Sequence, residues 1–395
     1  MRNSKLRIIV TGLIGLYPIG GVGWDYLQYP IGFLKMGHDV CYHEDTWSWP
    51  SHPVQRTYTQ DPKYSVEYIR DFVEKYAPGL RDRWHYLHLH DTSFGMDRQK
   101  FDEVAASADL FLNVSGSCMI PENLPGGCLK IFLDTDPGYN QIMLSERLSW
   151  SENIDRWCSS VEAHDRHFTY AENIHGPDCL VPKLNYHWKT TRTPISIEHW
   201  EHLAHVKPTG PWTTVMTWNA FKGKLIYRGV EYGSKGVEFE KLLNLPASVD
   251  MPLKVAVGGV SAPLARLSQA GWQVADGPGA TLSPAMYQEF IASSRGEISP
   301  AKHVYVALRT GWFSCRSACY LASGRPVVVQ DTGFTPYIAS GEGIIPYSSA
   351  EEAALGIIEV ERNYEKHAGA ALDLARQYFD CEKVLEKLID DVYSS

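Results

Sequence analysis

The chain has 395 residues, of which 44% are hydrophobic and 21% are charged. These proportions are typical of globular proteins, and they exclude a chain that is disordered, collagen-like or coiled-coil as a whole. At about 100–200 residues per domain, the length predicts two domains. The 37 basic residues are outnumbered by 46 acidic ones, which gives a net charge of -9. No run of Lys and Arg supplies the basic face that duplex nucleic-acid binding needs, so we expect no nucleic-acid partner.

The eight cysteines are scattered and form no CxxC pair, which is typical of reduced thiols in a cytoplasmic protein. Near the N-terminus, basic residues precede an apolar stretch and imitate a signal peptide. Several glycines and Pro18 interrupt that stretch, and no cleavage-site pattern follows, so we interpret it as a first core strand. No run reaches the roughly 18 apolar residues that span a bilayer. The sequence therefore predicts a cytoplasmic protein without a membrane span.

The first 45 residues predict a βαβ unit. Residues 6–11 (LRIIVT) form an apolar, β-branched run of the kind found in parallel strands that are buried on both faces. A glycine-rich turn follows, and then a helix over Tyr26–Met36, which Gly37 is suited to end. Pro30 is expected near the start of this helix or at a kink. A second strand over Asp39–His43 completes the opening of an α/β domain.

The alternation of strands and helices continues through the first half of the chain. Leu110–Val114 and Leu129–Leu133 are expected as strands, and so is Trp157–Val161. Residues 182–212 are rich in Pro, Thr, His and Trp and show no clear periodicity. We therefore expect the crossing between two domains there, and we place the first domain at residues 1–205.

A second α/β series begins with the strand expected at Thr213–Trp218. Its later strands include Leu253–Val257 and Pro326–Gln330, and three helices close the chain. We place the second domain at residues 206–378. The predicted fold class is α/β, with two doubly wound, Rossmann-like domains that face each other across a cleft. Ligands of such folds bind at the carboxyl ends of the parallel strands.

The most informative segment is Arg309–Phe334 (RTGWFSCRSACYLASGRPVVVQDTGF). It predicts a loop, a short helix that begins near Ser314, a buried strand and a second loop at Thr332-Gly333. A helix start offers unpaired N–H groups and the positive end of the helix dipole. Together with the glycine loop, it predicts a rim that binds a diphosphate. The alternative is that Ser314 only caps the helix and Gly333 only completes a turn.

Short motifs in both halves resemble GT-B glycosyltransferases, in particular the nucleotide-sugar-dependent families 1 and 4. Ala322-Ser323-Gly324-Arg325-Pro326-Val327-Val328 is similar to the A-x-G-x-P-V-V motif of their C-terminal domain. Thr332-Gly333-Phe334 stands where these families carry a Gly-Gly loop, and Lys235-Gly236 resembles their Lys-Gly pair. Gly20-Gly21 and Gly37-His38-Asp39-Val40 resemble their N-terminal glycine loop and strand entry.

The resemblance implies the GT-B fold, in which the N-terminal domain binds the acceptor and the C-terminal domain binds a nucleotide diphosphate sugar such as a UDP-sugar. It also implies that the last helix, 379–395 here, crosses back to the N-terminal domain. Transfer is expected to need no metal and no other cofactor. We expect the acceptor to be a small molecule or a glycan rather than a protein.

The chain departs from the family at two positions. The family carries two glutamates, eight residues apart, around the helix that precedes the A-x-G-x-P-V-V motif. Counted back from Ala322, these positions hold Gly311 and Cys319, which cannot accept hydrogen bonds as a carboxylate does. The usual carboxylate contact to the ribose is therefore in doubt, and Glu297 is a candidate replacement.

Positive side chains are expected to neutralise the departing diphosphate, because the resemblance implies a site that works without a metal. Lys binds phosphate as a point charge and Arg can bind it through two N–H groups. The alternative for each cation is a solvated surface charge. The predicted donor site consists of Lys235, Lys302, Arg309, Trp312, Phe313, Ser314, Arg316, Thr332 and Gly333.

Three aspartates are candidate catalytic residues. Asp25 follows the glycine loop, where an inverting enzyme could place the base that deprotonates the acceptor hydroxyl; the alternative is that it caps the first helix. Asp134 and Asp136 follow an apolar strand as Asp-Thr-Asp. This pair could bind Mg²⁺ or Mn²⁺, face the acceptor as a base, or form a strand-end turn, and we expect no metal site.

The sequence thus predicts a glycosyltransferase that moves a sugar from a nucleotide diphosphate sugar to an acceptor in the interdomain cleft. Fold does not fix function, so two alternatives stay open. One is a non-catalytic sugar- or nucleotide-binding protein, and the other is a sugar-nucleotide epimerase on the same scaffold.

Overall fold

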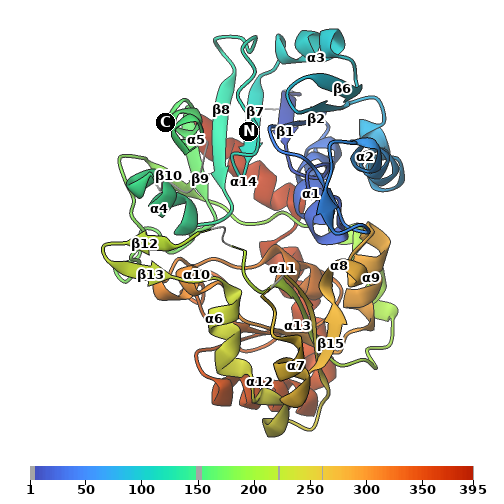
Figure 1. Cartoon of the computed structure of the whole chain (residues 1–395), viewed down its shortest axis with the longest axis vertical. Helices are drawn as coiled ribbons and strands as arrows, with labels where there is room; N and C mark the ends of the chain where they lie inside the picture. The colour runs from blue at the N-terminus through green and yellow to red at the C-terminus, as the bar shows by residue number, and fades with distance from the viewer. Residues whose placement is uncertain (1–4, 148–153, 221–222, 260, 395) are drawn as a thin grey trace.

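The computed structural model describes residues 5–147, 154–220, 223–259 and 261–394. Residues 1–4 of the predicted first domain and residue 395 of the predicted last helix lie outside the described residues. The described part forms two α/β halves, each built around its own sheet, with the N-terminal half above the C-terminal half in Figure 1. This arrangement confirms the predicted fold class.

In the described part of the chain, eight strands form the N-terminal sheet, in the order β10-β9-β8-β7-β1-β2-β5-β6. Neighbouring strands are parallel except for β5 and β6. The central strand is apolar throughout its middle because it is buried on both faces: Ile8, Ile9 and Val10 are at most 1% exposed. The elements of this half are β1 (Arg7–Thr11), α1 (Gly20–Lys35), β2 (Asp39–Thr46), β3 (Ser51–His52), β4 (Thr57–Tyr58), α2 (Lys63–Tyr76), η1 (Pro78–Leu80), β5 (Trp84–His88), β6 (Thr92–Gly95), α3 (Arg98–Ala105), β7 (Leu110–Val114), β8 (Leu129–Asp134), α4 (Tyr139–Glu146), α5 (Ile154–Glu162), β9 (Arg166–Thr169), β10 (Trp188–Thr190), η2 (Ile197–His199) and η3 (Glu201–His205).

The C-terminal sheet is parallel, and its described strands follow the order β15-β14-β11-β16-β17-β18. The order reverses beside β11, which places the carboxyl ends of β11 and β16 at the switch point where doubly wound sheets bind ligands. The elements of this half are β11 (Trp212–Thr217), β12 (Leu225–Tyr227), β13 (Val230–Tyr232), α6 (Lys235–Phe239), η4 (Glu240–Leu242), η5 (Leu245–Ser248), β14 (Leu253–Gly258), α7 (Leu264–Gln269), β15 (Gln273–Asp276), α8 (Gly277–Ala280), α9 (Pro284–Ser293), β16 (Gly296–Ser299), α10 (His303–Ala307), α11 (Cys315–Ala322), β17 (Val327–Gln330), β18 (Ile344–Tyr347), α12 (Ala350–Arg362), α13 (Tyr364–Tyr378) and α14 (Cys381–Tyr393).

The last helix, α14, lies against the N-terminal half, where it appears in red behind the first sheet in Figure 1. It packs so closely on α1 that a Cβ on Gly32 would lie 2.5 Å from Cδ1 of Leu385. Lys35 also pairs with Glu382, with 2.8 Å between Nζ and Oε1. The chain therefore ends on the half in which it begins. None of the helices in the described part is both long and apolar enough to cross a bilayer.

Two local predictions were wrong. Helix α1 begins at Gly20 rather than Tyr26, because the glycines predicted as a loop provide close packing inside a helix: a Cβ on Gly20 would lie 2.4 Å from the carbonyl oxygen of Ser283. Pro30 consequently lies in the middle of α1. The strand expected at Trp157–Val161 is part of helix α5, which buries Ile154, Cys158 and Val161 on one face.

The two halves contact each other on both sides of the space between the sheets. On one side, the Gly20 N–H donates to the Thr281 carbonyl at 2.6 Å, and the Trp24 indole N–H donates to the Pro284 carbonyl at 3.2 Å. On the other side, a shared hydrophobic cluster joins α4 to the C-terminal half. Members of this interdomain cluster include Ile142 and Met143 of α4, Leu225 of β12, Val304 of α10 and Leu308 directly after α10.

Candidate functional site in the interdomain cleft

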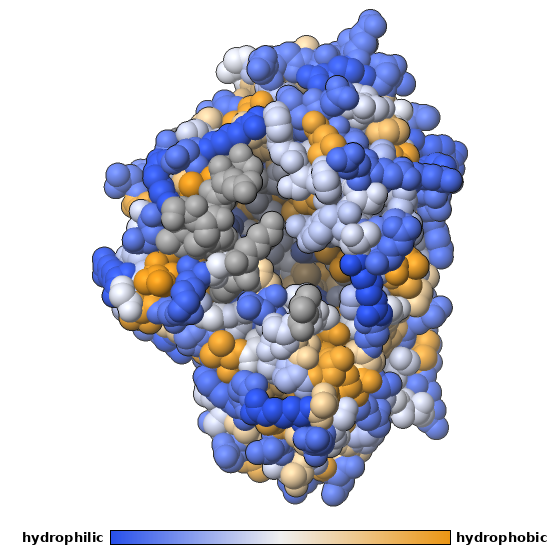
Figure 2. Space-filling view, viewed as in Figure 1, coloured by the Kyte–Doolittle hydropathy of each residue, from blue (hydrophilic) through white to orange (hydrophobic). Residues whose placement is uncertain are grey.

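A cleft of about 570 Å³ lies between the carboxyl ends of the two sheets, and Figure 2 shows the surface hollowed there. This volume is in the range of sites for small ligands, roughly 300–1,000 Å³. Its N-terminal wall is formed by Leu13, Ile19, Gly21, Val22, Asp25, Tyr26, Ser115, Thr135, Asp136, Asn140 and Tyr170. Its C-terminal wall is formed by Val215, Met216, Thr217, Ala220, Ser234, Lys235, Gly258, Gly259, Gly277, Pro278, Thr281, Tyr287, Lys302, Tyr305, Trp312, Ser314, Cys315 and Arg316.

The Arg316 guanidinium on the C-terminal wall is fixed by three acceptors. Its Nε donates to Oε1 of Glu297 at 2.5 Å, one terminal nitrogen donates to the Val215 carbonyl at 2.6 Å, and the other donates to the Ser299 hydroxyl. Arginine has five N–H donors, so two of them remain beyond these three bonds. A buried, oriented guanidinium at the cleft is suited to bind an anion.

Lys235 lies at the start of α6 and half-buried in the cleft, close to Arg316. Burial lowers the pKa of Lys235 well below its ordinary value, and the charge of Arg316 lowers it further. No carboxylate of the described residues forms an ion pair with this lysine. A bound anion would therefore favour its charged form.

Lys302, which precedes α10, bridges to the opposite wall. Its Nζ lies 2.7 Å and 2.6 Å from the two carboxylate oxygens of Asp136, which follows β8 of the N-terminal half. The hydroxyl of Tyr305, one helical turn after Lys302, also donates to this carboxylate. Asp136 and Lys302 therefore form an ion pair across the cleft.

Asp25 projects from α1 into the cleft, opposite the start of α11. Burial raises the pKa of its carboxyl to about 6, hydrogen bonding with the Cys315 thiol lowers it, and the charge of Asp136 raises it. A carboxyl with this pKa is mostly ionised at neutral pH and can still accept a proton, as a general base must.

No protein-family model matches the sequence, and no curated protein matches it. Solved structures match over nearly the whole chain. An α-glucosyltransferase in complex with UDP is matched over 99% of this chain and 100% of that chain, with a TM-score of 0.56 and 12% identity. HepE from Anabaena, in complex with UDP and glucose, is matched over 99% and 100%, with a TM-score of 0.53 and 11% identity. Sucrose-phosphate synthase from Thermosynechococcus elongatus is matched over 98% of both chains, with a TM-score of 0.50 and 12% identity.

The chain has the GT-B glycosyltransferase fold.

Within this GT-B fold, the structure brings seven of the twelve predicted site residues to the cleft. They come from five segments of the chain. Ser314 is the N-cap of α11 by its backbone, but its side chain makes no capping hydrogen bond. The seven residues are Asp25, Asp136, Lys235, Lys302, Trp312, Ser314 and Arg316.

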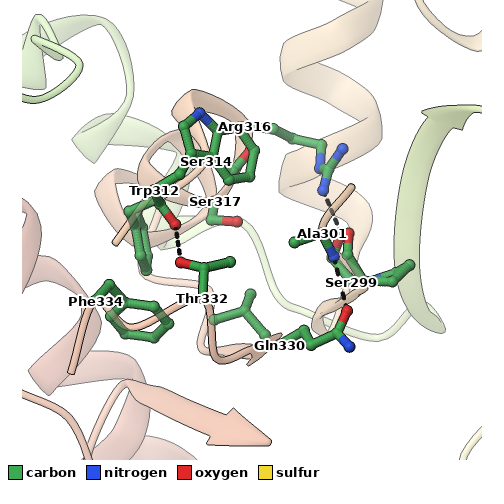
Figure 3. A pocket seen from close by; sticks show the side chains of 12 residues that line it. Ser299, Ala301, Trp312, Ser314, Arg316, Ser317, Gln330, Thr332 and Phe334 are labelled. Atoms are coloured by element: carbon green, nitrogen blue, oxygen red, sulfur yellow. Dashed lines mark hydrogen bonds between the residues drawn. The ribbon is translucent and has the colours of Figure 1, made fainter. Parts of the chain in front are cut away.

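The predicted Thr332-Gly333 loop does not line the GT-B cleft. The Thr332 hydroxyl donates to the Trp312 carbonyl at 2.6 Å (Figure 3). The space beside it measures about 20 Å³, which is too small for a diphosphate. Gly333 instead contacts the other half: a Cβ there would lie 3.1 Å from Nδ2 of Asn173, which donates to the Arg309 carbonyl at 2.8 Å. The loop where families 1 and 4 carry two glycines therefore forms a packing contact between the two halves of this chain.

Three further predicted residues also lie away from the cleft. Phe313 is in the core, where its ring packs on Phe334 and Phe379. Arg309 is directed to the surface and pairs with Asp178 at 2.5 Å. Asp134 is fully buried, and its two oxygens accept bonds from the backbone N–H of Asp136 and from the side chains of Asn140, Gln141 and Thr169. Asp134 therefore anchors the turn after β8, which was one of its three predicted alternatives.

Glu297 does not take the place of the missing glutamates. It is fully buried on β16, and its Oε1 accepts from Arg316. Its Oε2 accepts no hydrogen bond from any residue that the structure describes. Its role in this structure is to orient Arg316 rather than to contact a ligand.

Our sequence reasoning missed several polar residues of the N-terminal wall, together with Tyr305. Ser115 directly follows the strand predicted at Leu110–Val114, and Thr135 lies two residues after the strand predicted at Leu129–Leu133. Because parallel strands end at one edge of a sheet, polar residues in these positions were the available signal. Tyr305 follows Lys302 by three residues, the spacing that places two side chains on one helix face. In the described part of the chain, no group of three or more potential protein ligands for a metal ion occurs, and metal-independent transfer stays a prediction.

Proposed function

We propose that this chain is a glycosyltransferase that moves a sugar from a nucleotide diphosphate sugar, such as a UDP-sugar, to an acceptor hydroxyl in the interdomain cleft. The observation that supports it best is the grouping of Lys235, Lys302 and Arg316 on one wall, opposite Asp25 on the other. In a GT-B fold, cations on one wall are suited to neutralise a departing diphosphate, and a carboxylate on the other is suited to accept the proton of an acceptor hydroxyl.

The C-terminal wall provides the donor site in this proposal. Lys235 and the remaining N–H groups of Arg316 bind the diphosphate, with Ser314 and the start of α11 adding donors and a favourable dipole. Trp312 supplies an apolar surface beside them. As the bond between the sugar and the diphosphate breaks, negative charge grows on the leaving oxygen, and fixed cations stabilise that charge more than they stabilise the bound donor.

Asp25 acts on the acceptor in this proposal. Its carboxylate accepts the proton of the acceptor hydroxyl while the oxygen bonds to the anomeric carbon, and the nucleoside diphosphate leaves. The partly buried position keeps part of this carboxyl protonated near pH 6, where its pKa lies. Transfer therefore requires that Asp25 is ionised and that the cationic side chains of the opposite wall are charged.

Isothermal titration with UDP and with uridine tests the donor site. Lys235→Ala should weaken UDP binding by about 10–100-fold, because a charge-assisted contact contributes about 1.5–3 kcal/mol, and should leave uridine binding nearly unchanged. Lys366→Ala is the matched control, because Lys366 is an exposed surface lysine paired with Glu342. Equal weakening of both ligands by Lys235→Ala would contradict the phosphate role.

A turnover assay separates the proposal from its two alternatives. UDP released from a panel of UDP-sugars, measured with and without candidate acceptors, should exceed that of a heat-killed control. Binding of UDP without any turnover would favour a binding protein. An epimerised sugar nucleotide formed without acceptor would favour an epimerase.

A further inference from the structure

The two walls of the cleft carry opposite chemistry. Every cationic side chain among the described lining residues belongs to the C-terminal wall. On the N-terminal wall, the described polar side chains are carboxylates, hydroxyls and one amide. They are Asp25, Tyr26, Ser115, Thr135, Asp136, Asn140 and Tyr170.

Three of the hydroxyls of this wall, from three separate segments, form a connected row. The Tyr26 hydroxyl of α1 donates to Oγ of Ser115 at 2.9 Å, and Ser115 shares a 2.6 Å hydrogen bond with Oγ1 of Thr135. Ser115 and Gly116 have φ angles of +61° and +58°, so this row requires a left-handed turn after β7. The amide of Asn140 is fixed beside the row, because its Nδ2 donates to Asp134 at 2.7 Å.

Of the two aspartates on the same wall, Asp25 makes it unfavourable for anions. Asp136 is neutralised by Lys302, while Asp25 forms no ion pair with a cation of the described residues and faces the cleft directly. An acceptor that carries phosphate would bring a second negative charge next to Asp25. The cations that could compensate it lie on the opposite wall, where the donor diphosphate is proposed to bind.

We propose that the acceptor is a compact neutral sugar or polyol, recognised by the hydroxyl row of Tyr26, Ser115 and Thr135 rather than by a charge. This inference rests on the function proposed above. Sugar hydroxyls both donate and accept, as do the serine, threonine and tyrosine hydroxyls. A site built from such groups rejects analogues that cannot make the same hydrogen bonds. The contacts between the halves on both sides of the cleft favour a small acceptor over a polymer duplex.

The experiment compares matched neutral and charged acceptors with the UDP-sugar that shows the highest hydrolysis rate. Glucose and fructose are tested against their 6-phosphates, together with neutral disaccharides, glycerol, inositol and duplex DNA that contains 5-hydroxymethylcytosine. UDP release above the acceptor-free rate and the product mass are recorded. We expect at least one neutral compound to be used with a kcat/KM at least tenfold above that of any phosphorylated compound. The 6-phosphates should instead inhibit competitively against the UDP-sugar, because they bind the cationic wall.

Preference for a sugar phosphate or for DNA would overturn the proposal, and so would the absence of any product from the neutral panel. UDP titration of the same preparations distinguishes a failure of the proposed glycosyltransferase function from a failure of the proposed acceptor class. Absence of UDP binding refutes the proposed glycosyltransferase function, whereas UDP binding combined with a charged preferred acceptor refutes only the acceptor class.

A charge variant tests the physical cause. Thr135→Lys adds a cation to the N-terminal wall and should reduce the preference for neutral over phosphorylated acceptor at least threefold. Thr135→Gln adds a side chain of similar length without charge; both variants lose the Thr135 hydroxyl, so the threefold reduction is measured against Thr135→Gln rather than against the wild type. Equal preferences in the two folded variants, checked by circular dichroism, would show that the charge of this wall does not select the acceptor.

Discussion

The ion pair between Lys302 and Asp136 predicts that one substitution in the cleft strengthens donor binding instead of weakening it. In this structure Lys302 is held by a carboxylate of the opposite wall, so a donor diphosphate must compete with Asp136 for it. Asp136→Asn removes the competing charge, and we expect UDP to bind more tightly to this variant than to the wild type. If Asp136 contacted the donor itself, the same substitution would weaken binding.

The geometry and exposure of the pair set the size of this effect. Both Nζ–O distances are short, at 2.6 Å and 2.7 Å, and the side chains are 17% and 33% exposed for Lys302 and Asp136. Charge-assisted hydrogen bonds contribute about 1.5–3 kcal/mol, and solvent screening reduces a partly exposed pair towards about 1 kcal/mol. A competitor of about 1 kcal/mol corresponds to a roughly fivefold change in Kd.

A double-mutant cycle distinguishes this competition from a general loss of negative charge. UDP affinity is measured by isothermal titration in the wild type, Asp136→Asn, Lys302→Ala and the double variant. We expect Asp136→Asn to tighten binding only where Lys302 is present. Tightening of the same size in the Lys302→Ala background, or weaker binding by Asp136→Asn alone, would refute the reasoning.

Further predictions concern the base and the glycines. The kcat/KM of transfer should rise with pH through about 6 and level off above it, because Asp25 must be ionised to act as a base and its pKa is raised to about 6. In the variant Asp25→Asn, the rate of transfer should fall by roughly 10²–10⁴-fold. The UDP affinity of this variant, measured by calorimetry, should stay within twofold of the wild type. Gly20→Ala should lower the free energy of unfolding by about 1–3 kcal/mol, measured by urea denaturation, because its Cβ would lie 2.4 Å from a carbonyl oxygen of the other half. The control Gly21→Ala places a Cβ at an ordinary 3.5 Å contact and should change stability little; similar losses in both would contradict the packing argument. Gly333→Val should lower the Tm, because Gly333 has a φ of +94°, which valine rarely adopts, and because its backbone packs against Asn173. The same variant should leave UDP affinity unchanged. Weaker UDP binding by the folded variant would place the donor at this loop after all.

The fold was predictable because its signals are local. The apolar run at residues 6–11 and the later strand runs reflect burial on both faces of parallel sheets, which the composition of a short segment reveals. The start of α1 was not predictable in this way. Gly20 and Gly23 read as a loop, yet their missing side chains serve contacts with Ser283, 263 positions after Gly20, and with Phe72, which lies on another helix.

The candidate site was predictable where function depends on position along one strand or helix. Lys235 and Arg316 lie in the first turns of α6 and α11, and both line the cleft. The sequence did not place Gly333 away from the cleft, and it left three roles open for Asp134, because the roles of both residues depend on partners from distant segments. Asn173 packs against Gly333, and Asp134 accepts from Thr169. A local motif does not reveal such partners.

The hydrophobic cluster shared by Ile142, Leu225 and Val304 has a consequence for how the protein folds. Neither half can bury these side chains alone, and α14, which is made after both sheets, covers α1 of the N-terminal half. The two halves are thus expected to acquire stability together, in one cooperative transition rather than two. Synthesis must pass α14 before the first half is complete, so a chain shortened before Cys381 should expose apolar surface and aggregate even though both sheets are encoded in full.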